Sequence, residues 1–251
     1  MNLQGKHMWL VGASEGIGAE LARLLAQAGA HVAVSARNAK KITVLVAGLA
    51  HGNHLALPMD VTNQQSIDQA WSELTTRWPG IDMMLYNAGT YEPMAAQQFD
   101  LDIAARIIDV NFSGCLRVLS HVLPYFIDAK KGHIALVGSV AGYRGLPSAI
   151  GYGASKAAMI HLAENLKADL AASSIQVQII NPGFVKTRLT DKNDFAMPCI
   201  ITSEEAAQHI LSGLQSQRFE IHFPKRFSVF LKLISLLPPA IYFWLLKKMK
   251  L

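Results

Sequence analysis

Cysteine is scarce in this sequence: Cys115 and Cys199 are the only two among 251 residues. Two cysteines cannot build the disulfide framework of a small secreted domain, which favours a reducing compartment. The nine histidines show no metal-ligand spacing beside these cysteines, so we expect no bound metal. The first residues also lack the apolar core and cleavage site of a signal peptide. Together these absences predict a cytoplasmic protein.

Long apolar runs and a strong charge of one sign are also missing. The uncharged stretch over 233–246 is too short for a membrane-spanning helix, which needs about 20 residues, and Pro238 and Pro239 interrupt it. The formal net charge is +5, and part of it lies in the final residues KKMKL. A nucleic-acid-binding protein would show a basic face with interleaved aromatic residues. The sequence shows no such face, so we expect no nucleic-acid partner.

What the chain does contain is a regular alternation of short apolar runs with longer helical patterns. The apolar runs predict strands over 7–12, 31–36, 54–60, 82–89, 133–139, 175–183 and 219–223. The intervening patterns predict helices over 16–29, 38–49, 63–78, 99–129, 152–171 and 203–216. Continuous apolar strands that alternate with helices are typical of an α/β protein with a parallel sheet covered on both faces. In such sheets ligands bind beyond the carboxyl ends of the strands.

The first predicted strand ends in a glycine-rich turn, VGASEGIG, that leads into a helix. Gly12, Gly16 and Gly18 permit a tight turn and let a pyrophosphate approach the backbone. The following helix N-terminus adds free N–H groups and a positive dipole end. The spacing is GxxxGxG rather than the commoner GxGxxG. A glycine turn in this strand-to-helix context predicts a dinucleotide-binding site.

The end of the second predicted strand bears on which dinucleotide is bound. Proteins that use the unphosphorylated dinucleotide usually carry an acidic residue there for the ribose hydroxyls. This chain has Ala36 followed by Arg37, and an arginine can pair with a ribose 2′-phosphate. We therefore expect NADP(H) to be preferred over NAD(H), although Glu15 opposes this preference. The alternative is a solvated arginine at the start of a helix.

Tyr152 and Lys156 stand four positions apart in GYGASKAAMI, at the start of a predicted helix. Positions i and i+4 share one face of a helix, so the phenol and the ammonium would lie side by side. A nearby cation favours the phenolate and lowers the pKa of a tyrosine, which is about 10 in isolation. Such pairs also occur by chance, so this interpretation depends on the rest of the chain.

An ordered set of motifs at the strand ends supplies that context. GxxxGxG at 12–18, Asp60, NAG at 87–89, Asn111, Ser139, YGASK at 152–156 and PGFVKT at 182–187 occur in this order. Together, over about residues 5–223, they resemble a short-chain dehydrogenase/reductase. The resemblance implies a single doubly wound Rossmann-type domain over 1–224, with a parallel sheet of about seven strands. The chain departs from the family pattern at Val11 and Tyr86, where we expect a local hydrogen bond to be lost.

The resemblance also implies the chemistry, which is hydride transfer between a nicotinamide and a carbonyl carbon with proton transfer at the oxygen. In the family pattern Tyr152 is the acid/base, and Lys156 tunes its pKa and holds the nicotinamide ribose. Ser139 would hydrogen-bond the substrate oxygen, and Asn111 would support a water-linked proton path to the lysine.

A cofactor-binding set follows from the same resemblance. Asp60 would contact the adenine, Asn87 would lie by the adenosine ribose, and Thr187 would lie near the nicotinamide amide. Considered alone, Asp60 could also be a neighbour of a helix N-cap, since DVTNQQS is typical of a capping segment. The full predicted set is Gly12, Ser14, Gly16, Ile17, Gly18, Arg37, Asp60, Val61, Asn87, Ala88, Gly89, Tyr152, Lys156, Pro182, Gly183, Val185 and Thr187.

The C-terminal extension over 225–251 is the unusual part of the chain. Several of its apolar residues recur at helical spacing and would form one stripe: Phe227, Phe230, Leu231, Ile234 and Leu237. Three polar residues would lie opposite this stripe: Ser228, Lys232 and Ser235. The two prolines at 238–239 then break the helix, and the apolar stretch AIYFWLL follows.

Two interpretations of this extension stay open. Its basic residues flank the apolar ones, which suits peripheral attachment to the inner face of an anionic membrane: Lys225, Arg226, Lys247, Lys248 and Lys250. The alternative is that the stripe packs on the protein's own core or on a partner subunit.

We therefore predict an NADP(H)-dependent oxidoreductase that interconverts a carbonyl and an alcohol. Residues 90–98 and 188–202, expected to line the substrate pocket, contain several apolar side chains, which favours a substrate that is not highly charged: Met94, Phe195, Met197 and Ile200. In the family the region around the last strand often shapes the substrate pocket, so the apolar C-terminal extension hints at an apolar, lipid-like substrate. Two alternatives are a catalytically silent nucleotide-binding regulatory protein and a membrane-surface scaffold. The intact set of Ser139, Tyr152 and Lys156 favours the enzyme.

The family resemblance further implies a homodimer or homotetramer. Relatives commonly pair through the helices that here cover about 99–129 and 152–171. Ala154, Ala157 and Ala158 are small enough to let two helices approach closely.

Overall fold

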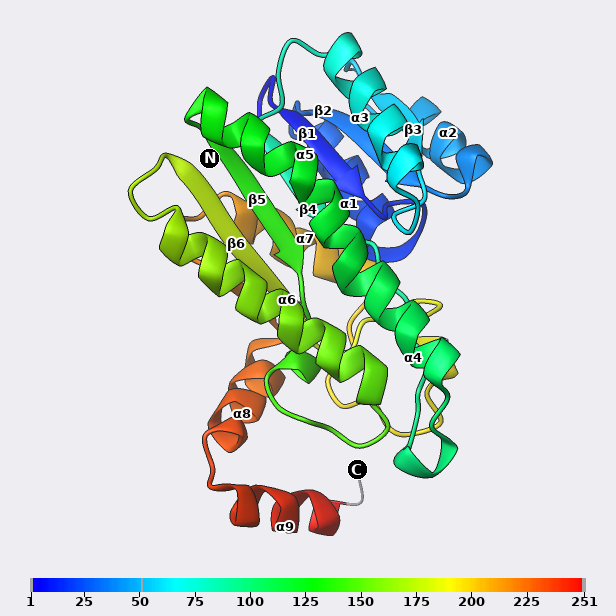
Figure 1. Cartoon of the computed structure of the whole chain (residues 1–251), viewed down its shortest axis with the longest axis vertical. Helices are drawn as coiled ribbons and strands as arrows, with labels where there is room; N and C mark the ends of the chain where they lie inside the picture. The colour runs from blue at the N-terminus through cyan, green and yellow to red at the C-terminus, as the bar shows by residue number, and fades with distance from the viewer. Residues whose placement is uncertain (1, 51, 250–251) are drawn as a thin grey trace.

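One parallel sheet forms the centre of the computed structural model, which describes residues 2–50 and 52–249 (Figure 1). Within these residues the sheet has seven strands in the order β3-β2-β1-β4-β5-β6-β7. The strands are β1 (His7–Val11), β2 (His31–Ala36), β3 (Leu55–Pro58), β4 (Met83–Tyr86), β5 (Gly132–Val137), β6 (Ile175–Pro182) and β7 (Glu220–Phe223). The order of the strands reverses between β1 and β4, where doubly wound sheets bind their ligands. The predicted fold class is confirmed.

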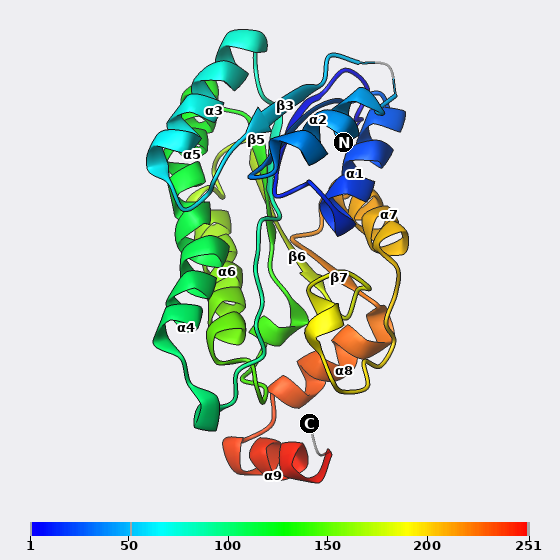
Figure 2. The same cartoon turned by 90° about the vertical axis from the view of Figure 1, so that its right-hand side faces the viewer.

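Helices cover both faces of the sheet, and Figure 2 shows the two layers from the side. One layer contains α3 (Gln64–Arg77), α4 (Leu101–Ile108), α5 (Gly114–Ala129) and α6 (Ile150–Asp169). The other contains α1 (Gly16–Gln27), α2 (Ala39–Ala47) and α7 (Ser203–Leu214). Short 3₁₀ turns occur at Ala96–Gln98, Val140–Gly142 and Thr190–Lys192.

Two hydrophobic cores follow from the alternation of side chains along each strand. In β1, Trp9 and Val11 pack in the core beneath α3, α5 and α6, whereas Met8 and Leu10 pack in the core beneath α1, α2 and α7. All four side chains are fully buried. Burial on both faces explains why the strands appear in the sequence as continuous apolar runs.

The predicted helix over 99–129 is interrupted. α4 passes through a π-helical turn (Asp109–Ser113) into α5. A π-helical turn holds an extra residue, which redirects the side chains around it and frequently marks a functional site. The apolar periodicity could not predict this turn, because the chain on both sides of it is helical.

Tyr86 at the end of β4 makes a hydrogen bond of its own, whereas we expected one to be lost at this position. Its ring is fully buried, and its hydroxyl donates to the carbonyl oxygen of Val110 at 2.6 Å. Val110 lies in the π-helical turn. The tyrosine therefore fixes that turn to the sheet.

Two further helices, α8 (Lys225–Ser235) and α9 (Pro239–Met249), lie at the carboxyl end of the sheet (Figures 1 and 2). A helical break is present as predicted, although α8 already ends at Ser235 and Pro239 is the first residue of α9. Among the helices in the described part of the chain, none combines the length and hydropathy that crossing a bilayer would need. The division of the chain into a domain over 1–224 and an extension over 225–251 stays a prediction.

The prediction of which residues form the apolar stripe of α8 is confirmed only in part. Leu231 and Ile234 are buried and pack with Val140. Phe230, by contrast, is exposed, and Ser228, predicted on the opposite face, is completely buried. Ser228 can be buried because its hydroxyl donates to the Pro224 carbonyl oxygen at 2.9 Å and lies 2.7 Å from His222 Nδ1. Packing on the protein therefore accounts for one face of α8.

We predict that Tyr86→Phe lowers the stability of the fold, because the Val110 carbonyl oxygen loses its hydroxyl partner while the ring remains in place. The free energy of unfolding should fall by about 1 kcal/mol. Denaturant unfolding of the two proteins measures this difference. Equal midpoints with equal slopes would mean that the hydroxyl contributes no net stability.

Candidate active site

A cavity of about 1670 Å³ opens at the carboxyl ends of the central strands. In Figure 1 this is the end of the sheet toward which the arrow of β5 points. The loops that follow β1 to β6 all contribute to its wall. The site residues predicted from the sequence line the cavity, except for Gly18 and Asn111, which are buried and do not reach it.

The glycine turn after β1 is shaped by two close approaches that exclude a side chain. Gly12 has a φ of 87°, and a Cβ atom there would lie 2.3 Å from the backbone nitrogen of Ala88. A Cβ atom at Gly18 would lie 2.7 Å from the carbonyl oxygen of Gly12. Glycine therefore lets the loop after β1 touch the loop after β4 and the first turn of α1.

The start of α1 is free to bind an anion. Glu15 is the N-cap residue of this helix, and its side chain makes no capping hydrogen bond. The N–H groups of the first turn, at Gly16 and Ile17, thus have no side-chain cap beside the cavity. A glycine cradle and an uncapped helix N-terminus fit the pyrophosphate of a dinucleotide.

Cationic side chains outnumber carboxylates around the cavity by eight to three. Glu15, one of the three, is already paired with Lys41 at 2.6 Å and with Arg188 at 2.9 Å. The hydrogen bond from Lys41, together with these charges, holds the pKa of Glu15 below its usual value. Arg37 is exposed at the cavity wall and forms no ion pair within the described residues. A free cation near a neutralised carboxylate fits a ribose 2′-phosphate.

Asp60 lines the cavity and also stabilises its own loop. One carboxylate oxygen accepts from the backbone N–H of Thr62 at 2.9 Å and from the Thr62 hydroxyl at 2.8 Å. The backbone N–H of Asp60 donates to the Ser66 hydroxyl at 3.0 Å. The N-cap of α3 is Asn63, so Asp60 is a neighbour of the cap, and its adenine contact stays a prediction.

The segment after β6 closes over the glycine turn. Its backbone is fixed by the N–H of Gly183, which donates to the Phe223 carbonyl oxygen at 2.7 Å. Val185 pairs with Ile201 in an isolated bridge. The Thr187 side chain comes so close to Gly16 that a Cβ atom there would lie 3.3 Å from its methyl group.

Tyr152 and Lys156 lie in the first turns of α6, four positions apart as predicted. The lysine Nζ is 5.7 Å from the centroid of the tyrosine ring, and it donates to the Val137 carbonyl oxygen at 2.8 Å. Ser139 follows β5, and its hydroxyl accepts from the N–H of Ala141 at 3.1 Å. The end of β5 and the start of α6 thus bring the three predicted catalytic side chains to one part of the cavity wall.

Burial is the largest influence on the pKa of Tyr152. Loss of solvation raises this pKa, and a hydrogen bond with the Ser139 side chain lowers it by a smaller amount. Burial also lowers the pKa of Lys156 to about 8. The buried ammonium of Lys156 is directed at the Val137 carbonyl oxygen, and the expectation that it lowers the pKa of Tyr152 stays a prediction.

Asn111 binds to protein groups with both ends of its amide. Its Oδ1 accepts from the N–H of Thr90 at 2.7 Å, and its Nδ2 donates to the Thr90 carbonyl oxygen at 3.0 Å and to the Ser155 hydroxyl at 2.9 Å. These bonds tie the π-helical turn to the loop after β4 and to α6. The water-linked proton path through Asn111 stays a prediction.

The apolar residues expected to line the substrate pocket lie elsewhere. Met94, Phe195, Met197 and Ile200 are all absent from the cavity wall. Met94 is buried where its backbone N–H donates to the Ser148 carbonyl oxygen at 2.9 Å, and the ring of Phe195 packs edge-on to Phe184 at 5.9 Å. From the same two segments, the wall instead contains Thr90, Leu189, Thr190 and Lys192.

Tyr91 is a neighbour of the proposed catalytic tyrosine that the sequence analysis did not identify. Its ring meets the ring of Tyr152 edge-on, with 4.9 Å between the centroids, and its hydroxyl donates to Asn193 Oδ1 at 2.8 Å. Burial raises the pKa of Tyr91 to about 12. Its position two residues after the NAG motif was the only available signal.

Comparison with known proteins places the chain in a family. A model described as short chain dehydrogenase matches residues 6–197. An uncharacterized oxidoreductase of Myxococcus xanthus is 32% identical over 235 residues, which is 93% of each chain. An uncharacterized oxidoreductase of Staphylococcus aureus is 30% identical over 181 residues, which is 72% of this chain and 78% of the relative.

Two solved structures share the fold. A short chain dehydrogenase from Burkholderia cenocepacia in complex with NADP has a TM-score of 0.82 at 24% identity, covering 96% of this chain and 98% of its own. A short-chain type dehydrogenase/reductase from Mycobacterium marinum has a TM-score of 0.79 at 27% identity, covering 88% and 95%. Together with the family match, these likenesses show that the chain belongs to the short-chain dehydrogenase/reductase family and is an NAD(P)-dependent oxidoreductase that acts on CH–OH and C=O groups.

Proposed function

We propose that this protein is a cytoplasmic, NADP(H)-dependent reductase that converts a carbonyl to an alcohol on an apolar, lipid-like substrate, with Tyr152 as the acid. The observation that carries the proposal is the meeting of Tyr152, Ser139 and Lys156 on the wall of one cavity that also contains the glycine turn. The bound cofactor would supply the hydride for the carbonyl carbon.

The protein's own contribution is the proton. A tyrosine of ordinary pKa is already protonated at neutral pH, and burial raises the pKa of Tyr152 further. Its phenol can therefore donate a proton to the carbonyl oxygen as C=O becomes CH–OH. The hydroxyl of Ser139 donates a hydrogen bond to the same oxygen and stabilises the negative charge that develops there. The phenolate left on Tyr152 then regains a proton from solvent, by way of the Lys156 ammonium.

Lys156 and Asn111 contribute to this step by positioning the cofactor and the cavity wall. The Nζ of Lys156 lies beside Gly89, where a Cβ atom would be 3.7 Å away, and this wall is where the cofactor ribose is expected. Asn111 fixes the same wall through Thr90 and Ser155. We infer that Lys156 binds the ribose hydroxyls. We also infer that Asn111 holds the loop after β4 against α6.

Preference for the phosphorylated cofactor is supported by charge. Arg37 lacks an ionic partner within the described residues, whereas Glu15 is neutralised by Lys41 and Arg188. The Burkholderia cenocepacia relative was solved in complex with NADP. We infer that Arg37 binds the ribose 2′-phosphate.

The substrate side is supported by one aromatic contact of Tyr152, since the ring of Tyr91 meets it edge-on. In the segment after β6, Phe184 packs against Phe195 and Phe227, although neither Phe184 nor Tyr91 forms part of the cavity wall. These rings make the surroundings of the wall apolar, which suits an apolar substrate.

A homodimer or homotetramer is supported by the outer surface of α4 to α6. Leu101 of α4 and Leu116 of α5 are exposed there, as are Ala154 and Ala157 of α6. Small side chains on α6 would let a second copy pack closely.

We predict that Tyr152→Phe lowers turnover of a ketone by about 10²–10⁴-fold, because the acid is lost while the ring is kept. Steady-state rates and a separate titration of NADPH binding measure the two effects, and cofactor affinity should change little. Tyr91→Phe is the matched control, since it removes a hydroxyl from the neighbouring ring and should cost far less. Unchanged turnover in Tyr152→Phe would show that another group supplies the proton.

We predict that Arg37→Ala weakens NADPH binding by about 10- to 150-fold, the worth of one charge-assisted hydrogen bond, and leaves NADH binding nearly unchanged. Fluorescence titration with each cofactor measures this. Arg23→Ala on the exposed side of α1, outside the cavity wall, is the control. Equal losses for the two cofactors would contradict a 2′-phosphate contact.

We predict a dimeric or tetrameric mass in sedimentation equilibrium. Ala157→Arg should dissociate this assembly, because the larger side chain separates the packed helices. Ala47→Arg on α2, at an exposed helical position on the opposite layer, should leave the mass unchanged. A monomeric mass for the unaltered protein would contradict the predicted assembly.

A further inference from the structure

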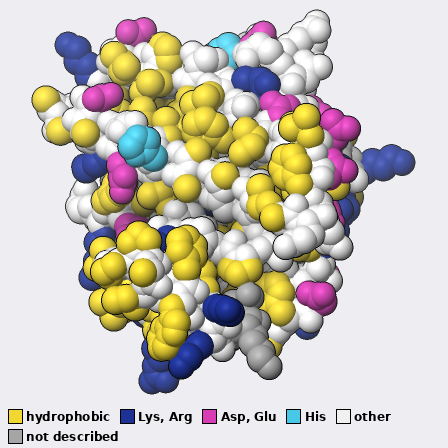
Figure 3. Space-filling model, turned by 60° about the horizontal axis from the view of Figure 1, so that its bottom comes forward, with side chains coloured by type: hydrophobic (Ala, Val, Ile, Leu, Met, Phe, Trp, Pro, Cys, Tyr) yellow, Lys and Arg dark blue, Asp and Glu magenta, His cyan; other side chains and the backbone are white. Residues whose placement is uncertain are grey.

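The two C-terminal helices present an unusual apolar surface to solvent. Fifteen large apolar side chains are exposed among the described residues, and seven of them lie between residues 229 and 244. They are Val229, Phe230, Leu233, Leu236, Ile241, Phe243 and Trp244, and we call them the outer face. Figure 3 shows hydrophobic side chains gathered beside Lys and Arg side chains at this end of the molecule. A surface of this kind usually marks an interaction site.

The inner faces of the same helices are already packed. Leu231 and Ile234 of α8 and Tyr242 and Leu246 of α9 form a cluster with Val140. This cluster gives each helix a buried side without any use of the outer face. The outer face is therefore apolar surface that the fold of the single chain does not need.

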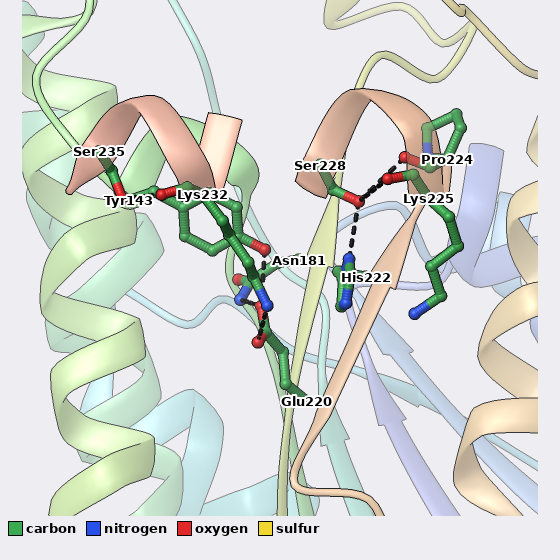
Figure 4. Close-up of polar contacts among 9 residues, drawn as sticks. All are labelled: Tyr143, Asn181, Glu220, His222, Pro224, Lys225, Ser228, Lys232 and Ser235. Carbon is green, nitrogen blue, oxygen red and sulfur yellow. Dashed lines mark hydrogen bonds and ion pairs between the residues drawn. The ribbon is translucent and has the colours of Figure 1, made fainter. Parts of the chain in front are cut away.

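Polar contacts fix the direction of α8, as Figure 4 shows. Glu220 accepts from the Tyr143 hydroxyl at 2.6 Å and from Asn181 Nδ2 at 2.8 Å, and its second oxygen pairs with Lys232 of α8. Burial of Glu220 is offset by these donors, which hold its pKa below the usual value. The helix cannot roll its outer face inward without breaking this network.

A second set of contacts fixes α9. The Arg144 guanidinium donates to the carbonyl oxygens of Ser235 and Leu237, at 2.8 and 2.5 Å, and lies 4.0 Å from the centroid of the Tyr242 ring. The Tyr242 hydroxyl donates to the Gly145 carbonyl oxygen at 2.8 Å. The outer face is thus held outward on both helices.

The charged side chains that α8 and α9 themselves carry have a single sign. The sequence after Glu220 contains no Asp or Glu, although it contains six Lys and Arg residues. Lys225, Arg226, Lys247 and Lys248 are exposed, and Lys248 Nζ lies 4.3 Å from the centroid of the Trp244 ring. Lys250 lies outside the described residues. Aromatic side chains flanked by lysines are typical of the interface of a lipid bilayer.

We propose that the outer face of α8 and α9 docks on an anionic lipid bilayer. Charge complementarity argues for this occupant: the cations meet lipid phosphates while Phe243, Trp244 and Leu236 enter the acyl boundary. A second copy of the chain fits poorly, because pairing the same face would bring cations together with no acidic residue of 221–251 to oppose them.

The position of the outer face also suits a reductase with a lipid-like substrate, a consequence that rests on the proposed function. α8 lies at the same end of the molecule as the carboxyl ends of the strands (Figure 1). Phe227 of α8 packs on Phe184 with 5.4 Å between the ring centroids, and it approaches Gly183 of the cavity wall. A substrate dissolved in the bilayer would reach the site from this side.

Vesicle sedimentation of the full chain tests the docking surface. We expect binding to vesicles of phosphatidylcholine and phosphatidylglycerol in equal parts, and much weaker binding to phosphatidylcholine alone. Added salt should weaken the first interaction without abolishing it, because burial of apolar side chains survives screening. Absence of binding to the anionic vesicles at low salt would overturn the proposal, as would equal binding to both vesicles.

Two variants and their matched controls locate the contact. Lys247→Gln with Lys248→Gln should weaken vesicle binding about 30-fold, from about fivefold for each cation. Phe243→Ser with Trp244→Ser should weaken it by at least about tenfold. The controls are Lys130→Gln with Lys131→Gln, and Ile127→Ser, which change exposed cationic and apolar residues between the last turn of α5 and the start of β5. Variants that bind like the unaltered chain would overturn the proposal.

Other occupants give different results in the same experiments. If the outer face joins two copies of the chain, Phe243→Ser with Trp244→Ser lowers the mass in solution and leaves vesicle binding unchanged, which overturns the proposal. Turnover of a water-soluble ketone is measured in parallel and should be unchanged in both variants. A chain without turnover that still binds anionic vesicles would remove the proposed function and leave the docking surface standing.

Discussion

Burial of the strands on both faces is the constraint on which the rest of this structure depends. A strand such as β1, with Trp9 and Val11 in one core and Met8 and Leu10 in the other, reaches solvent only at its ends. Residues that bind or react must therefore stand in the loops that follow the strands. Six such loops meet around one cavity, so residues from distant parts of the chain come to one site.

Two local irregularities make the loops fit together. The absence of a side chain at Gly12 lets the turn after β1 approach Ala88 in the loop after β4. The π-helical turn directs Asn111 to Thr90 in that same loop and to Ser155 of α6. The hydroxyl of Tyr86 holds this turn on the sheet. The cavity wall beside Tyr152 and Lys156 is thus braced by these four contacts, which join separate elements.

The same end of the molecule carries two neighbouring surfaces of different character. The cavity wall is rich in cations and is suited to phosphates, and the outer face of α8 and α9 is apolar with a cationic margin. Phe227 joins them, because it packs from α8 against Phe184 in the segment that closes the cavity. The first surface suits a charged cofactor, and the second is the surface for which we propose contact with a bilayer.

Much of this arrangement follows from local sequence patterns. Apolar runs predicted the seven strands, and the glycine spacing predicted the turn after β1, since both depend on neighbouring residues. The ordered motifs predicted the family, which the family match confirms, and the spacing of Tyr152 and Lys156 was enough to place them on one helical face.

Only the tertiary structure decided where these side chains point and what they contact. Lys156 is directed at Val137, Asn111 at Thr90 and Tyr143 at Glu220, partners that lie 19, 21 and 77 positions away. It also decided that α8 buries Ser228 and exposes Phe230. Helical periodicity assigns residues to a face, but which face is buried depends on the surfaces that long-range packing brings against it.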